Sequence, residues 1–122
     1  MFNAFIRTHH MTSRKKIARI RKAAKCISYG LIRSGGCPGL MYAEGTQQGV
    51  TEWVATVQAL RYKDYQLVRK PAPVEESGCA PAKEAQMQGF EEVDSVAVFA
   101  AEMEKRGILQ WWRSAMGFGE KD

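Results

Sequence analysis

Histidine, cysteine and asparagine are scarce in this sequence of 122 residues. The three cysteines, Cys26, Cys37 and Cys79, include no close pair and do not cluster with either of the two histidines. Structural zinc sites and small disulfide frameworks need such clusters. We therefore predict no bound metal and no cofactor, and we expect reduced thiols in an intracellular protein.

Long apolar runs are also missing. The longest obvious one, Val96–Ala101, is far shorter than the roughly 18 residues that a membrane-spanning helix needs, so no membrane partner is expected. Hydrophobic residues nevertheless make up 45% of the chain and include three Trp, four Tyr and five Phe. This composition can build the core of one ordinary soluble domain, and it argues against a wholly disordered chain.

Acidic residues are absent from the first 43 positions, which makes the charge distribution uneven. Residues 1–70 hold 13 Lys/Arg and 3 acids, a balance of +10, whereas residues 71–122 hold 5 Lys/Arg and 10 acids, a balance of −5. Clustered cations attract phosphates, so the first part is a candidate surface for polyanions. A solvated helix face is the alternative reading. We expect a nuclear or cytoplasmic location; a mitochondrial presequence is the alternative for the acid-free segment.

Apolar spacing predicts four strands and two helices between residues 2 and 70. The expected strands are Phe2–Thr8, Tyr29–Arg33, Leu40–Glu44 and Tyr62–Arg69. Thr12 or Ser13 can cap the first helix, whose apolar stripe is Ile17, Ile20, Ala24 and Ile27. Thr46 can cap the second helix, whose apolar stripe is Val50, Trp53, Val54, Val57 and Leu60.

The predicted order of elements, β-α-β-β-α-β, is the ferredoxin-like plan of the α+β class. Glycines and a proline between Arg33 and Leu40 suit the turn of a β-hairpin joining the two central strands. In this plan both helices cover one face of a four-stranded antiparallel sheet. The other face is left for a partner or for more of the chain.

The remaining chain is predicted to complete the same single domain. Residues 1–70 form the ferredoxin-like core, and residues 71–94 are rich in Pro, Ala, Glu and Gly without a period, which is typical of an acidic flexible loop. Residues 95–118 show helical spacing again, and Gly107 can end the first of these C-terminal helices. Trp111 and Trp112 need burial, so the C-terminal helices are expected to dock on the core.

Several sequence pieces occur in an order that resembles a known family. They are Thr8-His9-His10 with Ser13 and Lys16, Gly36-Cys37-Pro38-Gly39 leading into Glu44-Gly45, Glu52-Trp53, Leu60-Arg61, Val98 to Ile108, Trp111-Trp112-Arg113 and Met116-Gly117-Phe118. Over residues 2–118 the chain resembles the C-terminal domain of RWD-domain-containing proteins. It is also similar to the C-terminal RNA-binding domain of a spliceosomal small nuclear ribonucleoprotein subunit. The resemblance implies a ferredoxin-like fold and, on the spliceosomal branch, binding of small nuclear RNA with paired and single-stranded parts.

The candidate RNA-binding residues are cations and histidines near the first helix. Two flanks of that helix carry cations, a geometry that can straddle a phosphate backbone. The full set is Arg7, His9, His10, Arg14, Lys15, Lys16, Arg19, Arg21, Lys22, Lys25 and Arg33. Tyr29, Tyr42 and Tyr65 offer base-stacking surfaces if exposed, but core packing is the favoured interpretation for them.

No catalytic residues are predicted. His9 and His10 are adjacent in a strand and point to opposite sides, which defeats a common acid–base pair. Phosphoesterases of one class use two His-x-Thr/Ser elements, but His10-Met11-Thr12 has no second copy in this sequence. Acylphosphatase-like chemistry needs an asparagine, and Asn3 is the only one available. We expect a non-enzyme without a small-molecule substrate.

Two functions remain open at this point. One is an RNA-binding module that contacts the phosphate backbone through the basic first helix. The alternative is a protein–protein interaction module that uses the sheet face or the C-terminal helices without nucleic acid. The salt dependence of binding distinguishes the two functions, because phosphate binding weakens steeply with salt whereas docking of an apolar surface does not.

Overall fold

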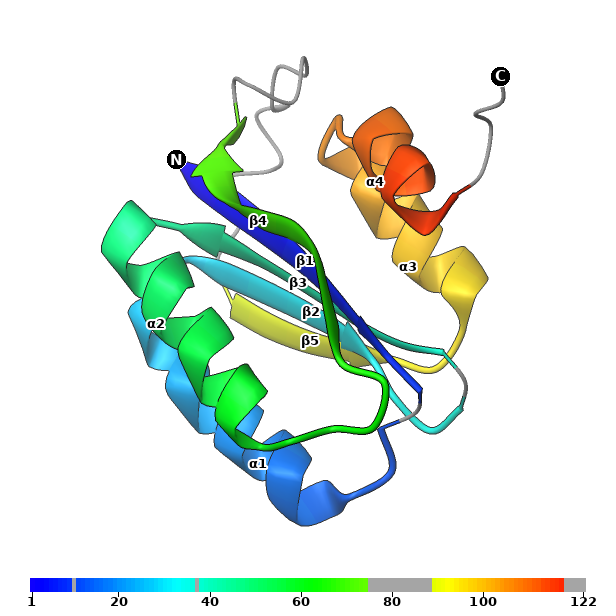
Figure 1. Cartoon of the computed structure of the whole chain (residues 1–122). Helices are drawn as coiled ribbons and strands as arrows, with labels where there is room; N and C mark the ends of the chain where they lie inside the picture. The colour runs from blue at the N-terminus through cyan, green and yellow to red at the C-terminus, as the bar shows by residue number, and fades with distance from the viewer. Residues whose placement is uncertain (10, 37, 75–88, 118–122) are drawn as a thin grey trace.

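The computed structural model describes residues 1–9, 11–36, 38–74 and 89–117 (Figure 1). Its elements in chain order are β1 (Phe2–Thr8), α1 (Arg14–Ala23), the short 3-10 helix η1 (Ala24–Cys26), β2 (Tyr29–Arg33), β3 (Gly39–Gly45), α2 (Gln47–Ala59), β4 (Gln66–Pro73), β5 (Gly89–Val93), α3 (Val96–Lys105) and α4 (Leu109–Met116). The fold is α+β. None of the described helices combines the length and the apolar character needed to cross a membrane.

The five strands form one mixed sheet in the order β4-β1-β3-β2-β5. β1 pairs antiparallel with both β3 and β4, and β2 pairs antiparallel with β3 from Tyr29↔Glu44 to Arg33↔Leu40. The predicted hairpin between the two central strands is therefore confirmed. Gly35 in its turn has a φ of +85°, a conformation that glycine adopts without a steric penalty, and its N–H donates to the carbonyl of Met11.

Helices α1 and α2 pack side by side on one face of the sheet (Figure 1). Ser13 and Thr46 cap them, since each side-chain oxygen accepts a hydrogen bond from a backbone N–H in the first turn. Trp53 is fully buried between α2 and the sheet, as predicted. Gly49 lets the start of α2 approach η1 closely, because a Cβ there would lie 1.9 Å from the carbonyl oxygen of Cys26.

The prediction of a flexible loop over residues 71–94 is wrong at both ends of that range, where the chain forms strands. β4 continues through Pro73, which an edge strand tolerates because proline need not donate to a neighbour there. Residues 89–93 form β5, which pairs in parallel with β2 in the register Tyr29↔Gly89 to Arg33↔Val93. The strand escaped prediction because only Phe90 and Val93 are apolar in it. Residues 75–88 lie outside the described residues.

Helices α3 and α4 cover the opposite face of the sheet (Figure 1). They build a second core, in which Phe99, Met103, Ile108 and Trp112 pack against a set of sheet residues. That set is Phe5, Tyr29, Leu31, Leu40 and Tyr42. The expected docking of the C-terminal helices is thus confirmed, and of the two occupants expected for this sheet face, more of the chain is the one found.

Candidate nucleic-acid interface

The seven predicted cations on α1 and η1 differ in their partners. Arg14 and Arg21 lie on the flank of α1 that meets β5, and both contact the carboxylate of Glu92. Arg14 Nη1 donates to Oε2 at 2.7 Å and Nη2 donates to Oε1 at 3.1 Å, while Arg21 Nη2 donates to Oε1 at 3.4 Å. The Arg21 guanidinium also lies 5.0 Å from the centre of the Phe90 ring. These two arginines therefore tie α1 to β5.

Glu92 is the centre of this contact. The hydrogen bond from Arg14 is the main cause that lowers the pKa of the Glu92 carboxyl, to about 2. A hydrogen bond donated by the Ser34 hydroxyl and the positive charges of Arg14 and Arg21 lower it further, against the opposing effect of burial. We call Arg14, Arg21, Ser34 and Glu92 the Glu92 cluster. The single carboxylate offsets one of the two guanidinium charges within the protein.

A second group of cations, Lys15, Lys16, Arg19 and Lys22, lies away from β5, and we call it the α1 ridge. Lys15, Arg19 and Lys22 are exposed, and their i, i+4, i+7 spacing puts them on one face of the helix over about 10 Å of its length. Lys16 is half-buried, with its Nζ 4.9 Å from the centre of the Tyr62 ring. Within the described part of the chain, no carboxylate forms an ion pair with any of the four.

The α1 ridge borders a shallow depression against the end of α2. Lys15, Lys16 and Arg19 line it together with Ala59 and Leu60, and its volume is about 240 Å³. Three cations thus converge on one concave surface. A phosphate group seated there would contact cations that have no competing carboxylate among the described residues.

Arg7 and Arg33 do not join the α1 ridge, contrary to the prediction that they support it. In the sheet register both residues are paired with Leu40, and Leu40 belongs to the core beneath α3 and α4. Side chains on directly paired residues share a face, so both arginines lie on the sheet face opposite α1. Arg33 Nη1 donates to the carbonyl of Pro38 at 2.8 Å.

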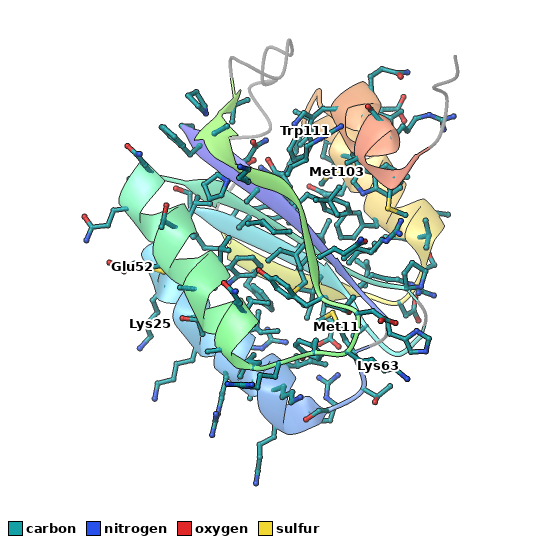
Figure 2. All side chains as sticks on the ribbon, in the orientation of Figure 1. Met11, Lys25, Glu52, Lys63, Met103 and Trp111 are labelled. Carbon is teal, nitrogen blue, oxygen red and sulfur yellow. The ribbon has the colours of Figure 1, made fainter. Side chains whose placement is uncertain are left out.

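The histidines and Lys25 complete the candidate set. His9 lies at the end of β1, where its Nδ1 is 3.6 Å from Asp64 Oδ2 and its backbone N–H donates to the carbonyl of Lys63. Both contacts are made within the protein and hold His9 against the segment that precedes β4. Lys25 on η1 is exposed and points away from the sheet (Figure 2). His10 lies outside the described residues.

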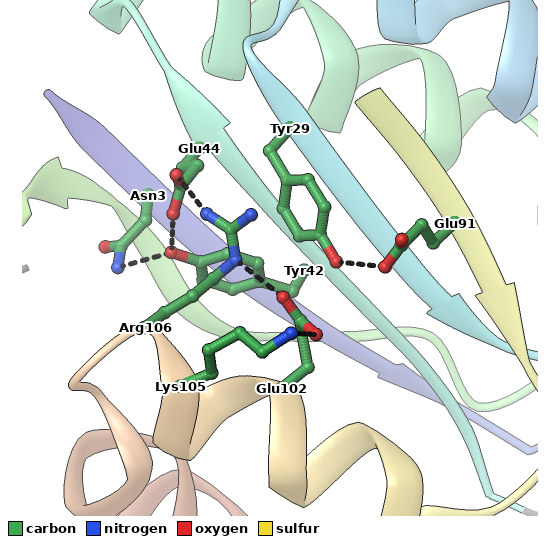
Figure 3. Close-up of polar contacts among 8 residues, drawn as sticks. All are labelled: Asn3, Tyr29, Tyr42, Glu44, Glu91, Glu102, Lys105 and Arg106. Carbon is green, nitrogen blue, oxygen red and sulfur yellow. Dashed lines mark hydrogen bonds and ion pairs between the residues drawn. The ribbon is translucent and has the colours of Figure 1, made fainter. Parts of the chain in front are cut away.

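A buried polar network between the sheet and α3 was missed by sequence reasoning (Figure 3). Arg106 is 1% exposed, and its Nη1 donates to Glu44 Oε2 at 2.6 Å while its Nε donates to Glu102 Oε2 at 3.2 Å. Its guanidinium carbon lies 3.4 Å from the centre of the Tyr29 ring. Burial raises the pKa of Glu44, whereas hydrogen bonds from Tyr42 and Arg106 and the charge of Arg106 oppose that rise. Glu44 and Arg106 are 62 positions apart, so no local pattern links them.

Tyr29 and Tyr42 are part of the same network. The Tyr42 hydroxyl donates to Glu44 Oε1 at 2.6 Å and accepts from Asn3 Nδ2 at 3.3 Å, and the Tyr29 hydroxyl donates to Glu91 Oε1 at 2.9 Å (Figure 3). Both rings are buried, so they serve the core and not base stacking, as the favoured interpretation held. Tyr65 is half-buried.

The described residues offer little for other site chemistries. No group of three or more His, Cys, Asp or Glu side chains among them could hold a metal ion. Cys26 is a free thiol, whose pKa is raised chiefly by burial, and Cys37 and Cys79 fall outside the described part.

In comparisons with known proteins, no family model matches this chain and no curated protein shows significant similarity to it.

Proposed function

We propose that this chain is a non-catalytic module that binds RNA through its phosphate backbone, with the α1 ridge as the contact surface. The observation that carries the proposal is the division of cations on α1. Arg14 and Arg21 both pair with the single carboxylate of Glu92, while Lys15, Arg19 and Lys22 stand exposed on one helix face without a carboxylate partner among the described residues. Such a row of cations releases counterions from a nucleic acid when it binds, which favours association.

The topology supports the proposal. The order β4-β1-β3-β2, with α1 and α2 on one face, is that of the ferredoxin-like plan, to which β5, α3 and α4 are additions. We propose this plan as the fold, and the sequence resemblance to the C-terminal domain of RWD-domain-containing proteins and to a spliceosomal RNA-binding domain points the same way. An intracellular site of action, in the nucleus or cytoplasm, follows from the same proposal.

The composition of the α1 ridge favours a phosphate backbone over a protein partner. Protein interfaces are usually centred on buried aromatic or aliphatic anchors. Between Lys15 and Lys22 the exposed residues of α1 are cations and the small Ala18, so this surface has no such anchor. Contacts to phosphates position a protein without reading bases, so we expect RNA binding with little sequence preference.

The test measures binding of a labelled RNA duplex with a single-stranded flank by fluorescence anisotropy at low salt. Lys15→Glu with Lys22→Glu should remove most of the affinity, because both charges lie on the exposed face of α1. Lys70→Glu with Lys105→Glu is the matched control, since it lowers the net charge equally on β4 and α3, where both lysines are exposed. Equal affinity of the two variants would show that the α1 ridge is not the contact surface. No binding by the wild-type chain would exclude RNA as the ligand and favour the protein-interaction alternative.

A further inference from the structure

A groove between β4 and α4 lies on the side of the sheet opposite the α1 ridge. It has a volume of about 640 Å³. Arg69, Lys70, Ala72 and Pro73 line it from β4, and Trp111 and Ser114 line it from α4. We call it the β4–α4 groove. It is open to solvent and borders the buried network around Arg106, since Asn3 also lines it.

The charge of the β4–α4 groove is positive. The described residues that line it include two cations and no carboxylate. Arg69 Nη2 donates to Ser114 Oγ at 3.1 Å, which holds the guanidinium at the wall, while its buried Nε has no hydrogen-bond partner in the structure. Lys70 is exposed. Two cationic side chains without a carboxylate among the described lining residues suit the carboxylate of a ligand.

The groove also has an apolar part. Trp111 lies between α4 and the sheet (Figure 2), where its ring packs edge-on against Tyr42 with a centroid distance of 5.9 Å. Because this contact fixes the indole, its exposed part is a rigid surface next to Ala72 and Pro73. Such a surface suits an aliphatic or aromatic side chain.

The edge of β4 decides how a bound chain can be recognised. β4 is the outer strand of the sheet and pairs with β1 alone among the described strands. Pro71 and Pro73 have no N–H, so the edge cannot add a full new strand, and recognition falls to side chains. Among the described residues one partly exposed indole lines the groove, which offers a nucleic acid one stacking position there.

We propose that the β4–α4 groove binds a short extended peptide segment of a partner protein, in which an acidic residue lies next to an apolar one. The carboxylate pairs with Arg69 and Lys70, and the apolar side chain packs on Trp111 and Pro73. This site is independent of the α1 ridge, so a chain that fails to bind RNA can still bind the peptide.

The test is selection of a phage-displayed library of random dodecamers against the full chain, followed by titration of the selected peptides. We expect enriched peptides with Asp or Glu beside an aliphatic or aromatic residue, and they should shift the indole N–H resonance of Trp111. Lys70→Glu should lower the affinity for the selected peptides by about tenfold, because the reversed charge repels their carboxylate. Lys25→Glu, an exposed reversal on η1, should leave their affinity unchanged.

Other results would overturn the proposal. They are a failure to enrich any peptide, selected peptides without carboxylates, and peptides that bind equally well to Lys70→Glu. Oligouridine is the nucleic-acid probe. If it moves the Trp111 resonance and displaces the peptides, the groove is a nucleic-acid site and the peptide proposal is wrong.

Discussion

Arg14 and Lys15 are adjacent in the sequence, yet only Arg14 has a carboxylate partner in the structure. The difference follows from helix geometry, since neighbouring residues lie about 100° apart around the axis. One side chain meets β5 and the other meets solvent. A charge count along the sequence treats both as binding candidates, and only the position of β5 separates them.

Glu92 should make stability depend on pH in the acid range. Its folded-state pKa of about 2 lies below the ordinary value of 4.5, so the ionised form is favoured in the folded protein. The stabilisation is fully present above about pH 4.5 and is lost as the pH falls towards 2. The urea midpoint of the wild type should exceed that of Glu92→Gln at neutral pH, and the gap should close below pH 4.5. A gap of constant size, or the same behaviour in the exposed control Glu104→Gln, would contradict this assignment.

Trp53→Ala should lower the free energy of unfolding by about 3–5 kcal/mol, because the fully buried indole leaves a cavity. Its Nε1 has no hydrogen-bond partner in the structure, so the loss is one of packing alone. Trp53→Phe retains most of the ring and should cost less. Urea denaturation followed by circular dichroism measures both. An unchanged midpoint for Trp53→Ala would show that the indole is not part of the core.

At the scale of elements, the local patterns between residues 2 and 60 predicted the structure well. The caps Ser13 and Thr46 and the stripe around Trp53 act within one helix, so the sequence carries them directly. β5 was missed because its pairing partner, β2, lies more than fifty residues earlier. Its stability as a strand comes from that pairing and from the contact of Glu92 with α1. Neither is visible in Gly89–Val93 alone.

Truncation after Gly107 should make the protein aggregate. The change removes α4 and Ile108, and with them Trp112, which is 2% exposed and packs against Phe5 and Phe99. A large apolar patch on the sheet is thereby uncovered. Truncation after Gly117 is the control, because it leaves α4 intact. Light scattering after gel filtration should find soluble aggregates only for the shorter chain, and a monodisperse shorter chain would count against docking of α4 as a stabilising contact.

At the scale of the whole molecule, the sheet separates two surfaces of different character. The α1 ridge lies on one side, and the buried network and the β4–α4 groove lie on the other (Figures 1 and 2). The sequence predicted the basic side but could not place Arg7 and Arg33, because strand alternation puts them opposite α1 only once the register is known. The groove was likewise beyond prediction, since it forms where β4 and α4 meet, and Arg69 and Ser114 across it are 45 positions apart.

The separation of the two surfaces leads to a prediction about salt. If Lys15, Lys16, Arg19 and Lys22 each meet one phosphate, the logarithm of the RNA association constant should fall against the logarithm of salt concentration with a slope between about −2.8 and −3.6. Lys15→Glu with Lys22→Glu should reduce this slope to about half or less, because at most two contacts remain. Lys70→Glu with Lys105→Glu should keep the wild-type slope, since those lysines lie on β4 and α3. Titrations at several salt concentrations measure all three values. A wild-type slope near zero would mean that binding, if any, is not made through phosphates, and a reduced slope in the control would place the contact on the other face of the sheet.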